Sequence, residues 1–193
     1  MAEADTKVSY ESTPNPESYK FIFSQNICDT PLNIDDPVKS SQSPLAHKIF
    51  GFPWVNSVYI GTDFITINKQ DWVEWDMIAE PLSQLLKEHI EEGEPVIASV
   101  DPAGEDFATP KHAINENDSE IVKQIKTFLD QEVRPFVAMD GGDVSFHKFD
   151  NNILEINMTG ACNGCPSSTQ TLKVGIESRI KNVIPEVHEV ISV

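Results

Sequence analysis

The residues most able to do chemistry lie near the end of the chain, where two residues separate Cys162 from Cys165. Gly160 and Gly164 permit a tight backbone around them, and Pro166 suits the first turn of a following helix. The unpaired N–H groups of a helix start favour the thiolate over the thiol, and the thiolate is the form that binds metal or attacks a disulfide. We therefore expect two exposed, activated thiolates that converge on one point.

A Cys-x-x-Cys pair allows three interpretations: an iron–sulfur cluster site, half of a zinc site, or a dithiol redox pair. Clusters and structural zinc normally need four ligands. His147 and His188 are the other candidates in this region, but both fall on predicted strands without metal-like spacing, so we expect surface or packing residues. A two-fold dimer completes the set more simply, because two copies of the loop supply four thiolates to a [4Fe–4S] cluster or to zinc.

The position of the pair disfavours the redox interpretation. A thioredoxin-like enzyme places its cysteines after an early strand of a longer βαβ pattern, whereas here only one helix and one strand remain. The chain holds three cysteines, too few for a disulfide-stapled scaffold. Cys28 has no cysteine or histidine at ligand spacing, so we expect it to be a structural thiol.

The elements that must position the pair form a compact α/β unit. A helical period, with Asn117 and Glu120 as cap and capping-box partner, predicts a helix over residues 118–134 that Arg134-Pro135 ends or kinks. Alternation predicts a hairpin of two strands, 144–149 and 153–158. A helix over 167–183 then crosses to a closing strand in 187–193. Its expected apolar face is Leu172, Ile176, Ile180 and Val183.

The first half of the chain has the pattern of a separate α+β domain. A strand is predicted over 19–24, a hairpin over 55–69, a short helix over 44–50 and a longer one over 76–89. A Pro-containing acidic stretch follows, within which residues 96–99 are a candidate closing strand. The predicted organisation is a domain over residues 9–95, an acidic linker over 96–117 and a second domain over 118–193.

Aromatic side chains gather in the first domain at Phe50, Phe52, Trp54, Trp72 and Trp75. Aromatic residues on the short elements of a small domain usually belong to its core, which is the interpretation we favour. The alternative is an exposed edge on which other proteins dock.

Composition excludes several classes of protein. The net charge of −17 would repel a phosphate backbone, so no nucleic-acid partner is expected. The apolar runs are far shorter than the roughly 20 residues of a spanning helix, so no membrane association is expected. The start of the chain lacks the features of a signal or transit peptide. We therefore expect a cytoplasmic protein of bacterial type, or an organelle-matrix protein after processing.

Several runs of the sequence resemble a known family. The runs RPFVAMDGGDVSF and TGACNGCPSSTQTLKVGIES are similar to the Nfu family, whose domain is like the C-terminal domain of the NifU iron–sulfur scaffold. Three runs of the first half resemble the Nfu N-terminal domain: TPNPESYKFIF, SPLAHKIFGFPWVNSVYIG and FITINKQDWVEWDMI. Both halves match in the expected order, and the long acidic linker is the one departure from the family pattern.

The resemblance implies a non-enzymatic carrier that holds a [4Fe–4S] cluster between two subunits and passes it to apo-proteins. Cys162 and Cys165 are the implied ligands, and a transient [2Fe–2S] form is left open. The implied partners are a second copy of the chain, upstream cluster-assembly proteins and apo iron–sulfur clients. A dithiol oxidoreductase and a zinc-bridged structural dimer remain the alternatives. The expected fold is two small domains of α+β or α/β class, the second with the order helix-strand-strand-helix-strand and a short mixed sheet.

Overall fold

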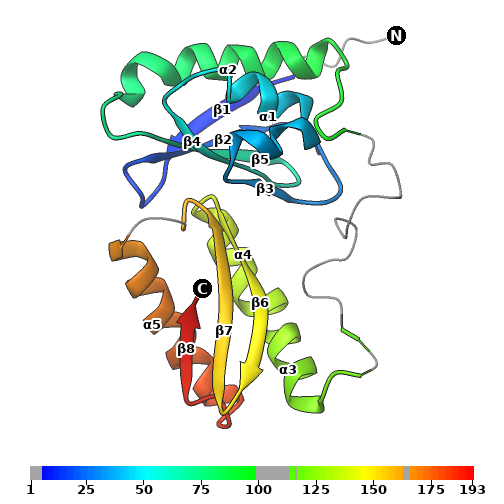
Figure 1. The fold of residues 1–193 in the computed structure, drawn as a ribbon, viewed down its shortest axis with the longest axis vertical. Helices are drawn as coiled ribbons and strands as arrows, with labels where there is room; N and C mark the ends of the chain where they lie inside the picture. Colours follow the sequence, from blue (N-terminus) through cyan, green and yellow to red (C-terminus); the bar gives the residue numbers. More distant parts are fainter. Residues whose placement is uncertain (1–5, 99–113, 116, 163–165) are drawn as a thin grey trace. The chain divides into compact units, whose positions relative to one another are not determined.

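The computed structural model divides the chain into two units, Met1–Asp106 and Phe107–Val193 (Figure 1). It describes residues 6–98, 114–115, 117–162 and 166–193, and the side chains of residues 166–172 stand outside that description. Most of the predicted linker, residues 99–113 and 116, therefore lies outside the described residues. Each unit mixes helices with strands around its own core, which confirms the predicted class of two small α+β or α/β domains.

The first unit is a five-stranded antiparallel sheet with helices on one face. Two helices cover it: α2 (Trp75–Glu91) packs on β1 and β2, and α1 (Pro44–Ile49), which follows the short η1 (Pro37–Gln42), packs on β4. The predicted hairpin is present, because Val55 pairs with Lys69 and Ile60 pairs with Ile65. The strands run in the order β1 (Val8–Ser12), β2 (Ser18–Phe23), β5 (Phe64–Lys69), β4 (Val55–Ile60), β3 (Leu32–Ile34).

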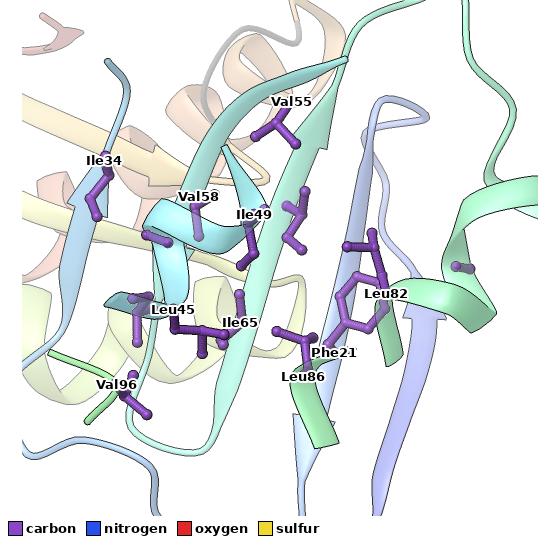
Figure 2. Packing of buried hydrophobic residues seen from close by; sticks show 14 of the residues in the cluster. Phe21, Ile34, Leu45, Ile49, Val55, Val58, Ile65, Leu82, Leu86 and Val96 are labelled. Atoms are coloured by element: carbon purple, nitrogen blue, oxygen red, sulfur yellow. The ribbon is translucent and has the colours of Figure 1, made fainter. Parts of the chain in front are cut away.

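The core of this unit gathers apolar side chains from the sheet, both helices and the segment after α2 (Figure 2). Phe21, Ile65 and Leu86 are all completely buried in it. Val96 joins the same core, and the Ala98 N–H donates to the Gln42 carbonyl at 2.8 Å. The segment after α2 therefore packs on the first unit. Residues 96–98 of the candidate closing strand over 96–99 are not a strand, and residue 99 lies outside the described residues.

The second unit has the predicted order helix-strand-strand-helix-strand. Its sheet is mixed, with β6 and β7 antiparallel and β7 and β8 parallel. A parallel pair needs a crossover, which α5 supplies. No helix in the described ranges is both long and apolar enough to cross a membrane. The elements are α3 (Glu120–Phe128), η2 (Leu129–Val133), α4 (Arg134–Met139), β6 (Gly142–Asp150), β7 (Ile153–Gly160), α5 (Pro166–Val183) and β8 (Glu189–Ser192).

Local chemistry explains the hairpin at the centre of this unit. Asn151 and Asn152 both have positive φ, 50° and 64°, which a tight two-residue turn between β6 and β7 requires and which asparagine tolerates better than most residues. Along β7, Leu154, Ile156 and Met158 alternate with half-buried residues and face the core. The hairpin therefore has one apolar face, on which the helices pack.

Two details of the helices differ from expectation. The first helix is capped by Ser119, whose Oγ accepts from the Val122 N–H at 3.3 Å, and not by Asn117. The helical backbone does not end at Arg134-Pro135 but continues to Met139. The irregularity there is the π-helical stretch η2, which directly precedes Arg134 and Pro135, a residue with no N–H to donate.

The buried face of α5 also differs in part from the predicted one. Ile176 and Ile180 are buried as predicted, but Val183 is 63% exposed and Ile184 takes its place in the core. Leu172 lies outside the residues whose side chains are described.

Candidate functional site

Cys162 lies two residues beyond the end of β7, and the β6–β7 hairpin sets its position. The ladder ends with Gly142 paired to Gly160, and the Ala161 N–H donates to the Gly141 carbonyl at 3.0 Å. Gly160 has φ +67°, and a Cβ there would collide with the Gly141 carbonyl oxygen. Only glycine fits this turn. The backbone that leads to Cys162 is therefore tied directly to the start of β6.

The sulfur of Cys162 packs into the core and is not exposed. The residue is 6% exposed and belongs to the apolar cluster of the second unit, with Val137 and Met158. Gly142 makes this possible, because a Cβ at that position would overlap the Cys162 sulfur. The expectation of an exposed thiol is therefore wrong for Cys162 in this conformation. The absence of a side chain at Gly142 provides the room for the sulfur.

An ion-pair clamp holds the strand that carries Gly142. The Arg134 guanidinium donates to both carboxylate oxygens of Asp143, from Nε at 2.8 Å and from Nη2 at 3.0 Å. Its Nη1 also donates to Asp130 at 3.2 Å. These bonds raise the pKa of Arg134 further above its ordinary value, so the guanidinium stays charged. The clamp ties η2 and α4 to the start of β6, next to the glycine that accommodates Cys162.

Sequence reasoning missed Arg134 and Gly142 as positioning residues. Both fall inside the run RPFVAMDGGDVSF, which carries the family resemblance. The available signal was an arginine and an aspartate nine residues apart, on either side of the turn that precedes β6.

Cys165, the second predicted ligand, lies outside the described residues. The helix that follows it begins at Pro166, as its sequence predicts. The start of α5, where the helix dipole is positive, therefore directly follows the cysteine pair in the sequence.

The other candidate ligands are not brought to this loop. His147 is exposed on β6, with Nε2 3.7 Å from Glu155. The His188 N–H donates to the Asn152 carbonyl, in the turn at the opposite end of the hairpin from Gly142. Both histidines are surface residues, as expected. Among the described residues, no group of three or more His, Cys, Asp and Glu side chains is placed to hold a metal ion.

Cys28 belongs to the first unit, and its surroundings are those of an unreactive thiol. Its thiol donates to the Gly61 carbonyl at 3.0 Å and packs at the edge of the core. Burial, with the nearby Asp29 carboxylate, raises the pKa of the thiol to about 11. It is therefore protonated near neutral pH, as a structural thiol would be.

Comparison with known proteins agrees with this division of the chain. A family model described as a NifU-like domain matches residues 125–191, and one described as the N terminus of the scaffold protein Nfu/NifU matches residues 8–93. The human protein named "NFU1 iron-sulfur cluster scaffold homolog, mitochondrial" is 35% identical over 185 residues, which cover 95% of this chain and 70% of that protein.

Other relatives and one solved structure carry related names. The Drosophila virilis protein of the same name is 37% identical over 185 residues, 95% of this chain and 60% of that protein. In the Drosophila willistoni relative, the match spans 64% of its length at 35% identity. The solution structure of a NifU-like protein from Saccharomyces cerevisiae is 31% identical, with a TM-score of 0.46, and the match covers 52% of this chain and 92% of that one.

Proposed function

This chain belongs to the Nfu family of iron–sulfur cluster scaffolds, and from that premise we propose that it carries a [4Fe–4S] cluster as cargo between two copies of itself. Cys162 and Cys165 of each copy are the ligands, and the cluster passes to apo-proteins by exchange of thiolates. The protein is a carrier and not an enzyme, because exchange of thiolates on iron needs no catalytic base.

The observation that carries this proposal is the support built around Cys162. The missing side chain of Gly142 leaves room for its sulfur, a backbone hydrogen bond from Ala161 fixes the turn, and the Arg134–Asp143 clamp anchors the strand beside it. A cysteine that served only to fill the core would not need a second cysteine three residues later, directly before the start of a helix.

The count of thiols supports sharing between two copies. The chain has three cysteines, and Cys28 is held protonated in the other unit. Two thiols per chain remain, whereas a cubane cluster takes four. Pairing two chains about a two-fold axis satisfies that number with identical contributions.

Loading and release both require Cys162 to change position. Cys162 as a residue is only 6% exposed, so its side chain must turn out of the apolar cluster before the sulfur can bind iron from solvent. In the loaded state an incoming client thiolate displaces one protein thiolate at a time. The positive end of α5 lowers the cost of the ionised thiol at each of these steps.

The decisive experiment is anaerobic reconstitution of the full chain with iron and sulfide, followed by absorption spectroscopy and analysis of iron, sulfide and zinc. We expect about four irons and four sulfides per dimer. Sedimentation should show a larger dimer fraction with the cluster than without it, because the cluster binds only the paired state. Cys162→Ser or Cys165→Ser should abolish stable binding, whereas Cys28→Ser should not change it.

Three outcomes would point elsewhere. A product that contains zinc alone would indicate a structural dimer. Insulin reduction at the rate of a dithiol oxidoreductase would indicate a redox pair. Full cluster occupancy in monomers, or in the Cys162→Ser protein, would show that the ligands are not those named.

The relatives bear on compartment and partners. Those compared are named mitochondrial, which favours the organelle matrix over a bacterial-type cytoplasm. Upstream assembly proteins and apo iron–sulfur clients are the partners that a carrier requires. The test of compartment is fractionation of the source cells with detection of the chain.

A further inference from the structure

One end of the first unit exposes large apolar side chains. Trp72 is 62% exposed, Met77 is 76% exposed and Phe52 is 37% exposed. Trp54 and Trp75 are buried, as expected for core aromatics, so the core interpretation holds for those two and fails for Phe52 and Trp72. We call Phe52, Trp72 and Met77 the tryptophan patch.

The backbone brings the members of this patch to the same end of the sheet. Val55 of β4 pairs with Lys69 of β5, so the segment before β4 and the segment after β5 leave the sheet together. The Gln70 N–H donates to the Trp54 carbonyl at 2.7 Å, which joins those two segments. Phe52 stacks on Trp54 with ring centroids 5.2 Å apart. Met77 lies in the first turn of α2, just after Trp72.

Three carboxylates, which form a negative rim, lie in the same short segment of the chain as Trp72 and Met77. Asp71, Glu74 and Asp76 are exposed, and within the part of the chain that the structure describes none of them forms an ion pair. Lys69 is close in sequence, but its ammonium group turns inward to Glu17 at 2.9 Å, and its side chain is 5% exposed. The patch therefore presents apolar surface inside an uncompensated negative rim.

We infer that the tryptophan patch is a docking surface for a basic segment of a partner protein, one that sets lysine or arginine side chains around an apolar anchor. An exposed tryptophan is the residue type that contributes most to protein interfaces, and its burial by an apolar anchor supplies the affinity. The carboxylate rim supplies selectivity and steering toward positive charge. A second copy of this chain fits poorly, because residues 6–98 hold 14 acidic residues against six lysines.

The tryptophan patch lies in the first unit and the cysteine pair in the second, so its test uses the full chain without a cluster. The probe is a fluorescent helical peptide of about 15 residues, with leucine on one face and lysine on the other. Its binding is followed by anisotropy at two salt concentrations. A peptide with glutamate in place of lysine is the charge control, and it should not bind.

A chain with a net charge of −17 attracts a basic peptide over much of its surface. Variants that remove the same charge at different places are therefore needed to show where the peptide binds. Trp72→Ala changes no charge and should weaken lysine-peptide binding by about tenfold or more. Asp71→Asn with Asp76→Asn should weaken it by about three- to tenfold at low salt. The matched pair Asp29→Asn with Asp63→Asn removes the same charge at the hairpin-turn end of the sheet, and it should change binding by less than about twofold.

A second apolar control is Val38→Ala, since Val38 is 83% exposed outside the patch and should not affect binding. Met77→Ala provides a second reporter of the patch, should Trp72→Ala alter the fold. Equal weakening by the two aspartate pairs, or loss of less than about twofold in both patch variants, would overturn the inference. Concentration-dependent self-association that Trp72→Ala abolishes would assign the surface to a second copy instead.

Discussion

Replacing Gly142 with alanine tests the packing that shelters Cys162. A Cβ at this position would overlap the Cys162 sulfur, and it would lie 3.1 Å from both the Thr159 carbonyl oxygen and a methyl of Val137. The two 3.1 Å contacts need only a few tenths of an ångström of adjustment, whereas the sulfur must move away. We therefore expect the variant to displace the Cys162 side chain.

The expected cost follows from overpacking a closed core. Inserting one methyl group in such a site destabilises by about 1–3 kcal/mol. Cys162→Ala alone should cost about 1 kcal/mol, because it removes one buried sulfur. In the double variant the new methyl group occupies the space that the sulfur left. The combined cost should then fall below the sum of the single costs by about 1–2 kcal/mol.

Urea unfolding of the full chain can measure these values unit by unit. All three tryptophans, Trp54, Trp72 and Trp75, lie in the first unit, so their fluorescence reports on that unit alone. Far-UV circular dichroism reports on both units, and the shift should appear only there. In a Cys165→Ser background, Gly142→Ala should also speed the alkylation of Cys162. Equal destabilisation with and without the Cys162 sulfur would refute the reasoning, because the backbone contact would then dominate.

Three further expectations follow from other contacts. Arg134→Ala should destabilise the second unit by about 1–3 kcal/mol, since it leaves the half-buried Asp143 carboxylate without its bidentate partner. Circular dichroism in urea measures the change in the free energy of unfolding. A change below about 0.5 kcal/mol would show that the clamp is dispensable. His89 is buried, and desolvation lowers its pKa in the folded state. The unfolded chain therefore binds the proton more tightly than the folded chain does, and the first unit should lose stability as the pH falls below about 6.5. Comparing tryptophan-monitored unfolding of wild type and His89→Gln at pH 7 and pH 5 isolates this effect, and identical pH dependence would contradict it. Cys28 has a thiol pKa of about 11, so iodoacetamide should label it slowly at pH 8, and rapid labelling would mean that the site is open.

The regular elements could be predicted wherever a local pattern was strong. The hairpin over 55–69, the helix after the cysteines and the parallel crossover to the last strand all follow from periodicity and turn residues. The edge strands β1 and β3 could not, because β1 is mostly exposed and β3 has three residues. Neither strand shows the alternation that predicts a half-buried strand.

A candidate site could be proposed from the sequence, but the surroundings of Cys162 could not be predicted from it. The spacing of Cys162 and Cys165 marked the loop, yet burial of the Cys162 sulfur depends on Gly142, which is 20 residues earlier and beside it only across the hairpin. The prediction of Asn117 as the helix cap was wrong for a similar reason, because it depended on the local pattern alone. Asp118 pairs with Lys126, eight residues later, at 2.7 Å, and Ser119 is the residue that caps the helix.

If the chain carries a cluster as proposed, the buried position of Cys162 limits the fraction of chains that can capture one. If about one chain in ten holds its sulfur outward, the apparent affinity of a chain for its ligand falls about tenfold. A site that bridges two chains needs both sulfurs outward at once, so the penalty is squared to about a hundredfold. A contact that turns Cys162 outward in one subunit therefore recovers at most about tenfold in apparent affinity, whereas a substitution is present in both subunits and can recover the full hundredfold. The same squared factor applies to release. In the proposed carrier, both Cys162 side chains return to the apolar cluster when the iron–sulfur cluster leaves, and this favours transfer of the iron–sulfur cluster to a client.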